Sequence, residues 1–505
     1  MESVVRVRAG KVRGRLAGGL HAFLGVPYAA PPVGGNRFRS PRPVESWSGI
    51  RDALSFGARP LQPIAPPEIA AMAPDPSANG DDCLNLNIWT KTLDGSGMPV
   101  MVWIPGGMFE VGSGATYDGS RFARDDVVCV TINYRVGASG FLYLDEGEAN
   151  FGLLDQIAAL TWVRDNIAAF GGDPANVTIF GESAGAMSIG ALLSMPRAQG
   201  MFRRAILQSG GPSTVMSAET AMKTARRLSE KLAVPLTREA LAAVPDERLL
   251  AAQTELKEEV AAAPDPVRWG DEVVATMMPF HTVVDGSIVP APPITRIAAG
   301  ASRQVDVIAG SNTQDWKMFV VANGLMGRIT DDIATGPVAK HGFQSLAAYG
   351  LPAEKALAAY RAVMPGASGA DILAAVQTDW WCRIPAIRLA EARVGAPGAT
   401  YMYEFAWPSP AAGGLFGACH ALEIAFVFDT LDKGADQMLG PLLGPEPPQS
   451  LADAMHKAWV AFAATGNPGW PKYDIRHRAT MRFDAVSKVI DDPRRWEREL
   501  WQGVR

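Results

Sequence analysis

Short apolar runs that end directly at a glycine-rich or polar turn recur along the chain. The run 100–104 leads into Gly106 and Gly107, and the run 177–180 leads into Gly181. Runs this short, bounded by turn residues, are typical of strands that are buried on both faces of a sheet. Further runs of the same kind lie at residues 127–132, 205–207, 305–309 and 401–405.

Helical patterns lie between these runs. One pattern ends at Gly171 and Gly172, and another, expected over residues 184–195, ends at Pro196. Strands that alternate with helices predict an α/β fold, with a large, mostly parallel central sheet covered by helices on both sides. The first pattern forms a single apolar face with spacings of three and four, through Leu153, Ile157, Leu160, Val163 and Ile167.

Three segments depart from this alternation. Residues 215–270 and 351–395 are helical and charge-rich, and we expect them to be helical insertions over the sheet. Residues 60–80 are rich in Pro and Ala, which predicts an irregular surface loop. Length alone suggests about three domains, but the sequence contains no repeat and no linker. We therefore expect residues 1–505 to form a single domain.

Composition excludes several classes of protein. The net charge of −5 and the lack of a basic block make nucleic acid an improbable partner. No apolar stretch approaches the roughly 18 residues of a membrane helix, and five basic residues between Arg6 and Arg15 interrupt any signal-peptide core. The four cysteines form no CxxC and no Cys/His cluster with metal spacing, so we expect a reduced, cytoplasmic protein without metal or cofactor. The sequence does not give the oligomeric state; a monomer is favoured.

Residues 181–185, Gly-Glu-Ser-Ala-Gly, match the GxSxG pattern once in the chain. About one chain in four of this length would contain the pattern by chance, so its setting decides its meaning. A strand ends at Phe180 and a helix begins at Ala184, which is the strand–turn–helix that the pattern requires. This setting predicts that Ser183 is a nucleophile; the alternative is a surface turn that contains Ser by chance.

A serine nucleophile needs a general base and an acid that orients it, in the chain order Ser, acid, His. Of the six histidines, His420 alone follows a late strand and a glycine-rich loop, although a lone His is more often structural. Asp315 is the first carboxylate after the run 305–309, and a surface Asp is its alternative. Asp306 lies inside that run, where ion pairing or an edge position explains it better. The other histidines are His21, His281, His341, His456 and His477.

An oxyanion hole needs backbone N–H groups aimed at the reacting carbonyl. Gly107 and Met108, beyond the run 100–104, and Ala184, directly after Ser183, are the candidates. A Gly-Gly turn has many structural explanations; its place after a central strand favours the functional one.

These residues resemble the type-B carboxylesterase and cholinesterase family. Residues 170–185 fit the nucleophile signature of that family at every specified position. Residues 82–87 resemble its second signature, with Asn85 where an aromatic residue or Thr is usual. Shorter family blocks recur from end to end, at residues 25–29, 31–34, 133–135, 208–210 and 465–468.

The resemblance implies an α/β-hydrolase fold, with Ser183 as nucleophile, His420 as base and Asp315 as acid. The family acid is usually Glu, and Asp is shorter by one C–C bond, about 1.5 Å. The loop that carries Asp315 must therefore approach His420 more closely. The early loop disulfide of the family is absent, because no cysteine precedes Cys83.

Three further departures concern glycine positions and the oxyanion block. Ala421 stands where Gly is common. In the oxyanion block, residues 105–108, Pro105 replaces the His or Tyr that is often the first residue. Met108 replaces the third glycine of the block, so an N–H remains but the conformational freedom of glycine does not. We expect the oxyanion hole to be kept and to be narrowed by Met108. Activity toward esters of bulky tertiary alcohols should therefore be poor.

The expected activity is hydrolysis of uncharged carboxylic esters with short to medium acyl chains, through an acyl-enzyme on Ser183. A His base with a pKa near 6.5 to 7 predicts activity that rises through that range. The alternatives are a carbamate or aryl-amide hydrolase with the same residues, and a non-catalytic binding relative. Four residues near the motifs are candidates for an apolar substrate pocket, although each is at least as easily explained as core: Phe109, Met318, Phe319 and Phe416.

Overall fold

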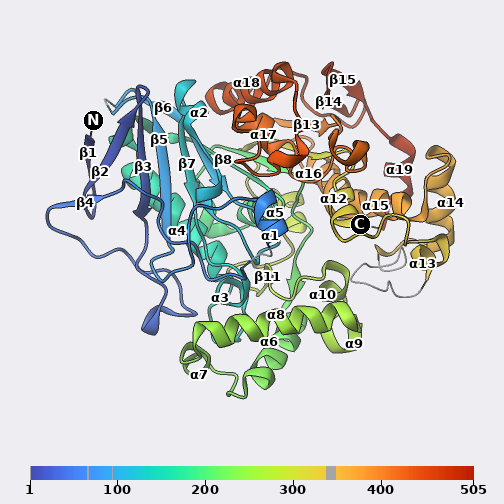
Figure 1. Cartoon of the computed structure of the whole chain (residues 1–505), viewed down its shortest axis with the longest axis horizontal. Coiled ribbons are helices and arrows are strands. Elements are labelled where there is room, and N and C mark those ends of the chain that lie inside the picture. Colours follow the sequence, from blue (N-terminus) through green and yellow to red (C-terminus); the bar gives the residue numbers. More distant parts are fainter. Residues whose placement is uncertain (1, 65–66, 94, 337–348, 505) are drawn as a thin grey trace.

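The computed structural model describes residues 2–64, 67–93, 95–336 and 349–504. Over these residues, thirteen strands form one sheet in the order β1-β2-β3-β5-β7-β6-β8-β9-β12-β13-β14-β15, with β4 paired to β2 (Figure 1). Each pair from β7 to β14 is parallel, and the pairs toward either edge are antiparallel, apart from β2 with β4. The centre of the sheet is parallel, as the alternation of strands and helices predicts.

The strands of this sheet are β1 (Glu2–Val7), β2 (Gly10–Ala17), β3 (Leu20–Pro27), β4 (Ile50–Asp52), β5 (Asn85–Thr90), β6 (Met98–Ile104), β7 (Val128–Ile132), β8 (Gly172–Glu182), β9 (Arg204–Gln208), β12 (Asp306–Asn312), β13 (Thr400–Phe405), β14 (Ala479–Phe483) and β15 (Lys488–Asp491). A separate pair consists of β10 (Met216–Ser217) and β11 (Val283–Val284).

The helices of the described residues fall into three groups. Those that pack against the sheet are α2 (Ser120–Arg124), α4 (Phe151–Asn166), α5 (Ala184–Leu192), α16 (Ile384–Ala392), α17 (Ile424–Val427) and α18 (Gln449–Thr465), with α11 (Pro293–Ala298) beside α5 and α16. A lower group consists of α6 (Ala218–Leu232), α7 (Arg238–Ala242), α8 (Asp246–Ala262), α9 (Pro266–Trp269) and α10 (Asp271–Thr276), with α3 (Gly137–Phe141) next to α8. The remaining helices are α1 (Pro67–Met72), α12 (Lys317–Ala322), α13 (Asp331–Thr335), α14 (Ala353–Val363), α15 (Gly369–Thr378) and α19 (Arg495–Leu500).

Strand β6 demonstrates why the sheet is buried on both faces. Val100, Val102 and Ile104 belong to one apolar cluster, which includes residues of α4, α5 and α16. Met101 and Trp103 point to the opposite side, into a second cluster that includes α18. Because successive side chains of a strand alternate, a strand that is apolar at every position needs helices on both faces.

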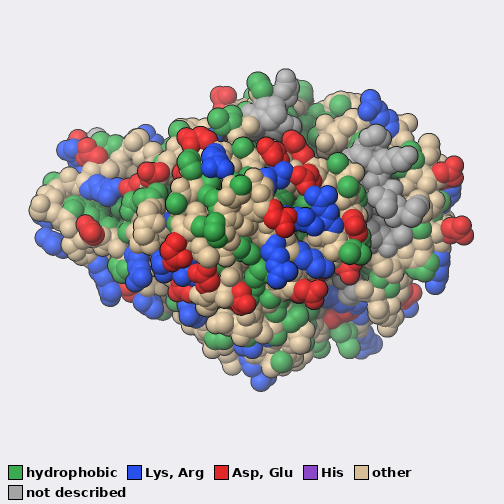
Figure 2. Space-filling model, turned by 90° about the horizontal axis from the view of Figure 1, so that it is seen from below, with side chains coloured by type: hydrophobic (Ala, Val, Ile, Leu, Met, Phe, Trp, Pro, Cys, Tyr) green, Lys and Arg blue, Asp and Glu red, His purple; other side chains and the backbone are tan. Residues whose placement is uncertain are grey.

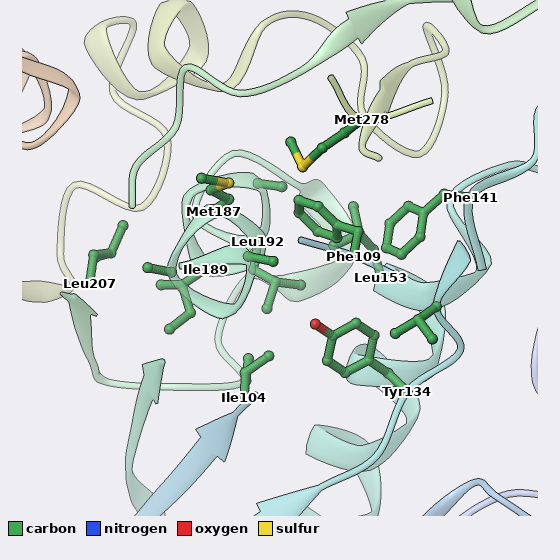
Figure 3. Packing of buried hydrophobic residues seen from close by; sticks show 14 of the residues in the cluster. Ile104, Phe109, Tyr134, Phe141, Leu153, Met187, Ile189, Leu192, Leu207 and Met278 are labelled. Carbon is green, nitrogen blue, oxygen red and sulfur yellow. The ribbon is translucent and has the colours of Figure 1, made fainter. Parts of the chain in front are cut away.

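Helix α5 packs directly against the sheet (Figure 3). Its residues Ile189 and Leu192 lie beside Ile104 of β6, and all three are fully buried. Tyr134 completes this part of the core and donates a hydrogen bond from its hydroxyl to the Pro105 carbonyl at 2.7 Å. The start of α5 is therefore fixed relative to the ends of two central strands.

The helices α6 to α10 lie below the sheet in the view of Figure 1. Seen from below, this face mixes acidic and basic side chains closely (Figure 2). Lys231 of α6 pairs with Glu255 and Glu259 of α8 at 3.0 and 2.6 Å, and Arg268 of α9 pairs with Glu259. The charge-rich segment 215–270 is thus a helical layer held partly by ion pairs between its own members.

Some boundaries differ from the expected ones. Strand β8 begins at Gly172, well before the apolar run 177–180, because the polar residues that precede the run continue its backbone conformation. Helix α5 ends at Leu192, before Met195, and a 3₁₀ turn begins at Pro196. The segment 60–80, expected to be irregular, contains the short helix α1. In the described residues no helix combines the length and the apolar character needed to span a bilayer.

Candidate active site

The residues singled out from the sequence lie beyond the carboxyl ends of neighbouring parallel strands. Residues 106–108 follow β6, Ser183 follows β8, Asp315 follows β12, and His420 follows β13. In a parallel sheet these ends share one edge, where ligands of α/β proteins bind. The topology therefore collects the four segments into one place.

Ser183 sits in a strained turn between β8 and α5. Its φ and ψ of 55° and −123° are sparsely populated for a residue with a side chain. A Cβ added at Gly185 would lie 2.0 Å from the Ile104 carbonyl oxygen, and one added at Gly181 would lie 2.6 Å from the same atom. The two glycines let the helix approach β6 this closely, while the Ser183 N–H donates to the Gln208 carbonyl at 2.9 Å and fixes the turn.

His420 and Asp315 are joined through their side chains and their loops. His420 Nδ1 lies 2.9 Å from Asp315 Oδ1, and the Asn312 N–H donates to Asp315 Oδ2 at 3.0 Å. The His420 N–H also donates to the Asp315 backbone carbonyl at 3.1 Å. Asp315 is fully buried and His420 nearly so.

Gln314 binds the same two loops to each other. Its N–H donates to the Ala418 carbonyl at 3.1 Å, and its Oε1 accepts from the Ala418 N–H at 3.2 Å. Together with the bond from the His420 N–H, these contacts hold the loops side by side. The loop that carries Asp315 therefore lies directly against the loop that carries His420.

The other ring nitrogen of His420 faces Glu182, the residue before Ser183. His420 Nε2 lies 3.0 Å from Glu182 Oε1. Ser183 and His420 line one cavity, but no hydrogen bond joins them in the described part of the chain. In this arrangement the imidazole bridges two carboxylates, and Ser183 is its neighbour.

This bridge changes the acidity of the imidazole. Burial alone would lower the pKa of His420, but the negative charge of Glu182 and the hydrogen bonds of the ring outweigh it, and the pKa is held well above 6.5. Burial in turn raises the pKa of Glu182, opposed only in part by the charge of His420.

A third carboxyl group, Glu423, lies behind this pair without touching the imidazole. It accepts hydrogen bonds from Gln208 Nε2 at 3.1 Å and from Asn312 Nδ2 at 2.6 Å. Burial, reinforced by the charges of Glu182 and Asp315, raises its pKa to about 8. Glu423 is therefore mostly uncharged at neutral pH.

The segment beyond β6 has the geometry of a donor loop. Gly107 has a φ of 116°, and a Cβ there would lie 2.2 Å from the Val111 carbonyl oxygen, so only glycine fits. Met108 and Phe109 follow with φ of 56° and 60°, a left-handed conformation that is uncommon for residues with side chains. Among the described residues, the N–H groups of Gly107, Met108 and Ala184 have no hydrogen-bond partner. Three donors near Ser183 are thus available to a ligand.

The cavity around Ser183 and His420 is apolar and sulfur-rich. Its walls come from α5, from the segment around Met278, from the start of α12 and from the helix 369–392. Phe319 is among the lining residues, whereas Phe109, Met318 and Phe416 are not. The lining residues are Met108, Ser183, Met187, Ser209, Met278, Trp316, Phe319, Trp381, Cys382 and His420.

Three of the expected pocket residues lie outside this lining. Phe109 is fully buried and packs edge to face on Phe141, with centroids 4.9 Å apart, while Met187 and Met278 lie on its other side (Figure 3). Met318 and Phe416 are half-buried and pack against the second apolar cluster, on the far side of the sheet from α5.

The remaining histidines have other surroundings. His281 is fully buried, and its Nδ1 lies 3.0 Å from the Met278 carbonyl. His456 lies on α18, with its Nδ1 2.7 Å from the Val427 carbonyl, and His477 is exposed beside Asp474. His21 pairs with the Ser3 hydroxyl at 2.7 Å, and His341 lies outside the described residues. Asp306 accepts from the Ala399 N–H and pairs with Arg204, as its strand position suggests.

Sequence reasoning missed seven residues that line the cavity or face His420: Glu182, Met187, Ser209, Met278, Trp316, Trp381 and Cys382. Glu182 was in view as the second residue of the motif, but nothing in the sequence reveals that it faces the imidazole. Trp316 directly follows Asp315, so its position in the sequence could have indicated that it lies near the site. Trp381 and Cys382 lie within a helical pattern, and nothing in the sequence indicates that they reach the site. With Asp315 and His420, Cys382 brings three potential metal-ligand atoms within 4.8 Å of one another.

The chain is similar to known proteins along its whole length. A model of the carboxylesterase family matches residues 1–501. The para-nitrobenzyl esterase of Bacillus subtilis is 35% identical over 510 residues, which cover 98% of each chain. The phenmedipham hydrolase of Pseudarthrobacter oxydans is 34% identical, over 93% of this chain and 92% of that protein. The crystal structure of the Geobacillus stearothermophilus carboxylesterase EST55 superposes with a TM-score of 0.81 at 37% identity, and covers 99% of this chain and all of the other.

Proposed function

The chain belongs to the carboxylesterase family and is a carboxylic-ester hydrolase with the α/β-hydrolase fold, and from this premise we propose that it works through an acyl-enzyme on Ser183. The observation that carries the proposal is the shared cavity of Ser183 and His420, with the imidazole held at 2.9 Å by Asp315. A nucleophile, a base and an orienting acid are the three groups that acyl transfer by serine requires.

In the first step, Ser183 Oγ attacks the ester carbonyl and gives its proton to His420 Nε2. This nitrogen must be neutral and must turn from Glu182 to the serine hydroxyl. The alcohol then leaves with the proton from His420, and the acyl group stays on Ser183. Water, activated by His420 in the same way, then attacks the acyl-enzyme, releases the carboxylic acid and restores the serine.

Asp315 holds the imidazole in the tautomer that protonates Nδ1 and stabilises the imidazolium that forms. Its full burial and its bond from the Asn312 N–H give the carboxylate one orientation. The unpartnered N–H groups of Gly107, Met108 and Ala184 support an oxyanion hole at this place. Such donors matter because each typically contributes about 10² to 10³ in rate.

The lining of the cavity favours uncharged esters with short to medium acyl chains. Met187, Met278, Trp316, Phe319 and Trp381 present apolar surface, which rewards burial of an acyl chain and offers nothing to a charged one. Met108 narrows the same space beside the donor loop, so esters of tertiary alcohols should fit poorly.

A carbamate hydrolase with the same residues is the second candidate. The observation in its favour is the similarity to a phenmedipham hydrolase, since phenmedipham is a carbamate. A carbamate would bind as an ester does and place its carbamoyl carbon at Ser183.

The test compares p-nitrophenyl butyrate with a matched aryl carbamate and a matched anilide. We expect the ester to have the largest kcat/KM and Ser183→Ala to abolish turnover of all three. Met318→Ala, outside the cavity, is the control for handling and folding. A carbamate turned over faster than the ester would favour the second candidate. Full activity in folded Ser183→Ala would refute the acyl-enzyme. A wild type that turns over none of the three substrates and is not labelled by an organophosphate would favour a binding role.

We propose further that residues 1–505 act as one catalytic unit, as a monomer in the cytoplasm, on a small-molecule ester and without nucleic acid or a cofactor. The family match over residues 1–501 supports the single unit. The buried, unpaired state of all four cysteines suits a reducing compartment. Light scattering of the purified chain tests the monomer: a mass near 53.7 kDa supports it and twice that mass refutes it.

A further inference from the structure

Cys382 reaches the active site because the helix that carries it changes its winding. Helix α15 continues through the π-helical segment Asp379–Arg383 into α16. Pro385, at the start of α16, has no N–H to donate to the preceding turn, so the regular ladder cannot pass through it. Such π turns occur frequently at functional sites. The wider turn leaves Cys382 fully buried, in the wall of the cavity.

Three ligand atoms from three separate segments converge there. One atom each of Asp315, Cys382 and His420 lies within 4.8 Å of the others. Around a tetrahedral Zn²⁺, with bonds of about 2.0 to 2.3 Å, ligand atoms lie roughly 3.3 to 3.7 Å apart. His420 Nδ1 and Asp315 Oδ1, now 2.9 Å apart, need to separate slightly, and any pair farther apart needs to approach by at most about 1 Å. A thiolate, an imidazole and a carboxylate are the donors that Zn²⁺ prefers.

The surroundings of the cluster fit a bound cation. The Cys382 thiol donates to the Ser209 carbonyl at 3.4 Å, and the Asn312 N–H donates to Asp315 Oδ2 at 3.0 Å, so two ligands are already oriented by neighbours. The Ser209 hydroxyl is buried and has no hydrogen-bond partner among the described residues, although it lines the same cavity. It offers a fourth oxygen near the cluster, and two of the three ligand residues, Cys382 and His420, line the same cavity.

We propose that Asp315, Cys382 and His420 form an inhibitory Zn²⁺ site in the wall of the cavity. Zn²⁺ displaces the thiol proton to solvent and binds the sulfur, one His420 nitrogen and one Asp315 oxygen. Either ring nitrogen suffices for inhibition, because Nε2 is needed to accept the serine proton and Nδ1 is needed for the bond to Asp315. Inhibition by Zn²⁺ rests on the proposed role of His420 as base, whereas the binding of Zn²⁺ does not.

The test titrates ZnCl₂ into the full chain by calorimetry, in a buffer that does not bind metal, for the wild type, Cys382→Ser and Cys419→Ser. Cys419 is the matched control, because it is buried next to His420 but is not one of the three ligands. We expect one Zn²⁺ per wild-type chain, reversible by EDTA, and at least a tenfold weaker Kd in Cys382→Ser, about 1.4 kcal/mol or more. Inhibition, normalised to each variant's own activity, should follow the same order.

A binding experiment without turnover separates this site from the proposed catalysis. Ser183→Ala should bind Zn²⁺ as the wild type does, because Ser183 is not a ligand. Co²⁺ bound to the wild type should give a thiolate charge-transfer band, a readout that stands even if Cys382→Ser does not fold. Equal Zn²⁺ affinity in folded Cys382→Ser, or Co²⁺ binding without that band, would overturn the proposal.

Discussion

In the proposed mechanism the imidazole of His420 is the base, and its two carboxylate neighbours, Glu182 and Asp315, affect the pH at which it can accept a proton. The charge of Glu182 and the hydrogen bonds of the ring raise the pKa of His420 against the opposing effect of burial. A protonated imidazole cannot accept the Ser183 proton, so activity is present above this pKa and lost below it. The rise in kcat/KM should therefore lie at higher pH than an ordinary His, with a pKa near 6.5, would predict.

Glu182→Gln should move this rise to lower pH, because it removes the negative charge at Nε2 and keeps the shape of the side chain. The matched control is Glu423→Gln, since Glu423 has a pKa of about 8 and is already mostly neutral. The measurement is the pH profile of kcat/KM for the wild type and both variants. An unmoved midpoint in Glu182→Gln would show that the 3.0 Å contact does not set the pKa.

A second prediction concerns Asp315, where substitution by Glu, the usual acid of the family, should lower kcat. Asp315→Asn should lower kcat by about 10⁴, because the amide cannot hold the required tautomer. Asp315→Glu should also lose about 10²-fold, because Gln314 and the backbone bonds fix the two loops and a longer acid displaces His420 by about 1 Å. Steady-state kinetics with p-nitrophenyl butyrate measure both. Wild-type kcat in Asp315→Glu would mean that the loops adjust freely.

Among the larger elements, we expect the donor loop beyond β6 to determine which alcohols fit. Met108 occupies a left-handed conformation at φ 56°, which costs roughly 1 to 2 kcal/mol for a residue with a side chain. Met108→Gly removes that strain but makes the unfolded chain more flexible, so stability should change by less than about 1 kcal/mol. The N–H stays, and the space beside it widens.

We therefore expect Met108→Gly to raise the ratio of kcat/KM for tert-butyl over n-propyl acetate by at least about tenfold, or 1.4 kcal/mol. Met278→Ala enlarges the same cavity without changing the residues of the loop and should leave the ratio near its wild-type value. An equal rise in both variants would assign the selectivity to cavity size and not to the donor loop.

The individual elements also show which features could be predicted from the sequence and which could not. The parallel centre of the sheet was predictable because strands buried on both faces are apolar at every position, as in Val100–Ile104. The elbow at Ser183 was predictable because strand, glycine and helix are contiguous. The placement of Cys382 was not, since it depends on one π turn inside an otherwise regular helical pattern. The contact of Glu182 with His420 joins residues 238 positions apart and depends on packing alone.

At the scale of the whole molecule, one buried ion pair joins the segment that follows β7 to helix α4. Arg135 donates two bonds of 2.7 Å to Asp155, which also accepts the Arg135 N–H at 3.0 Å, and both side chains are buried. Asp155→Asn leaves the guanidinium buried without its counter-charge, which should cost about 3 to 5 kcal/mol of unfolding free energy. Asp165→Asn, whose partner Arg8 is largely exposed, should cost less than about 1 kcal/mol.

Urea denaturation of the wild type and the two variants measures this difference. Comparable midpoints for Asp155→Asn and Asp165→Asn would mean that the pair contributes no more than a surface contact, and that the packing around α4 stabilises this region without it.

Covalent capture of the nucleophile is the most direct measurement of the catalytic arrangement. Wild-type enzyme treated with a small organophosphate and digested should carry one phosphoryl group per chain, on Ser183, with activity lost in proportion to labelling. His420→Ala should label far more slowly, because no base is available to take the proton. Labelling of Ser209 or another residue with Ser183 unmodified, or full activity in a chain labelled at Ser183, would contradict the account.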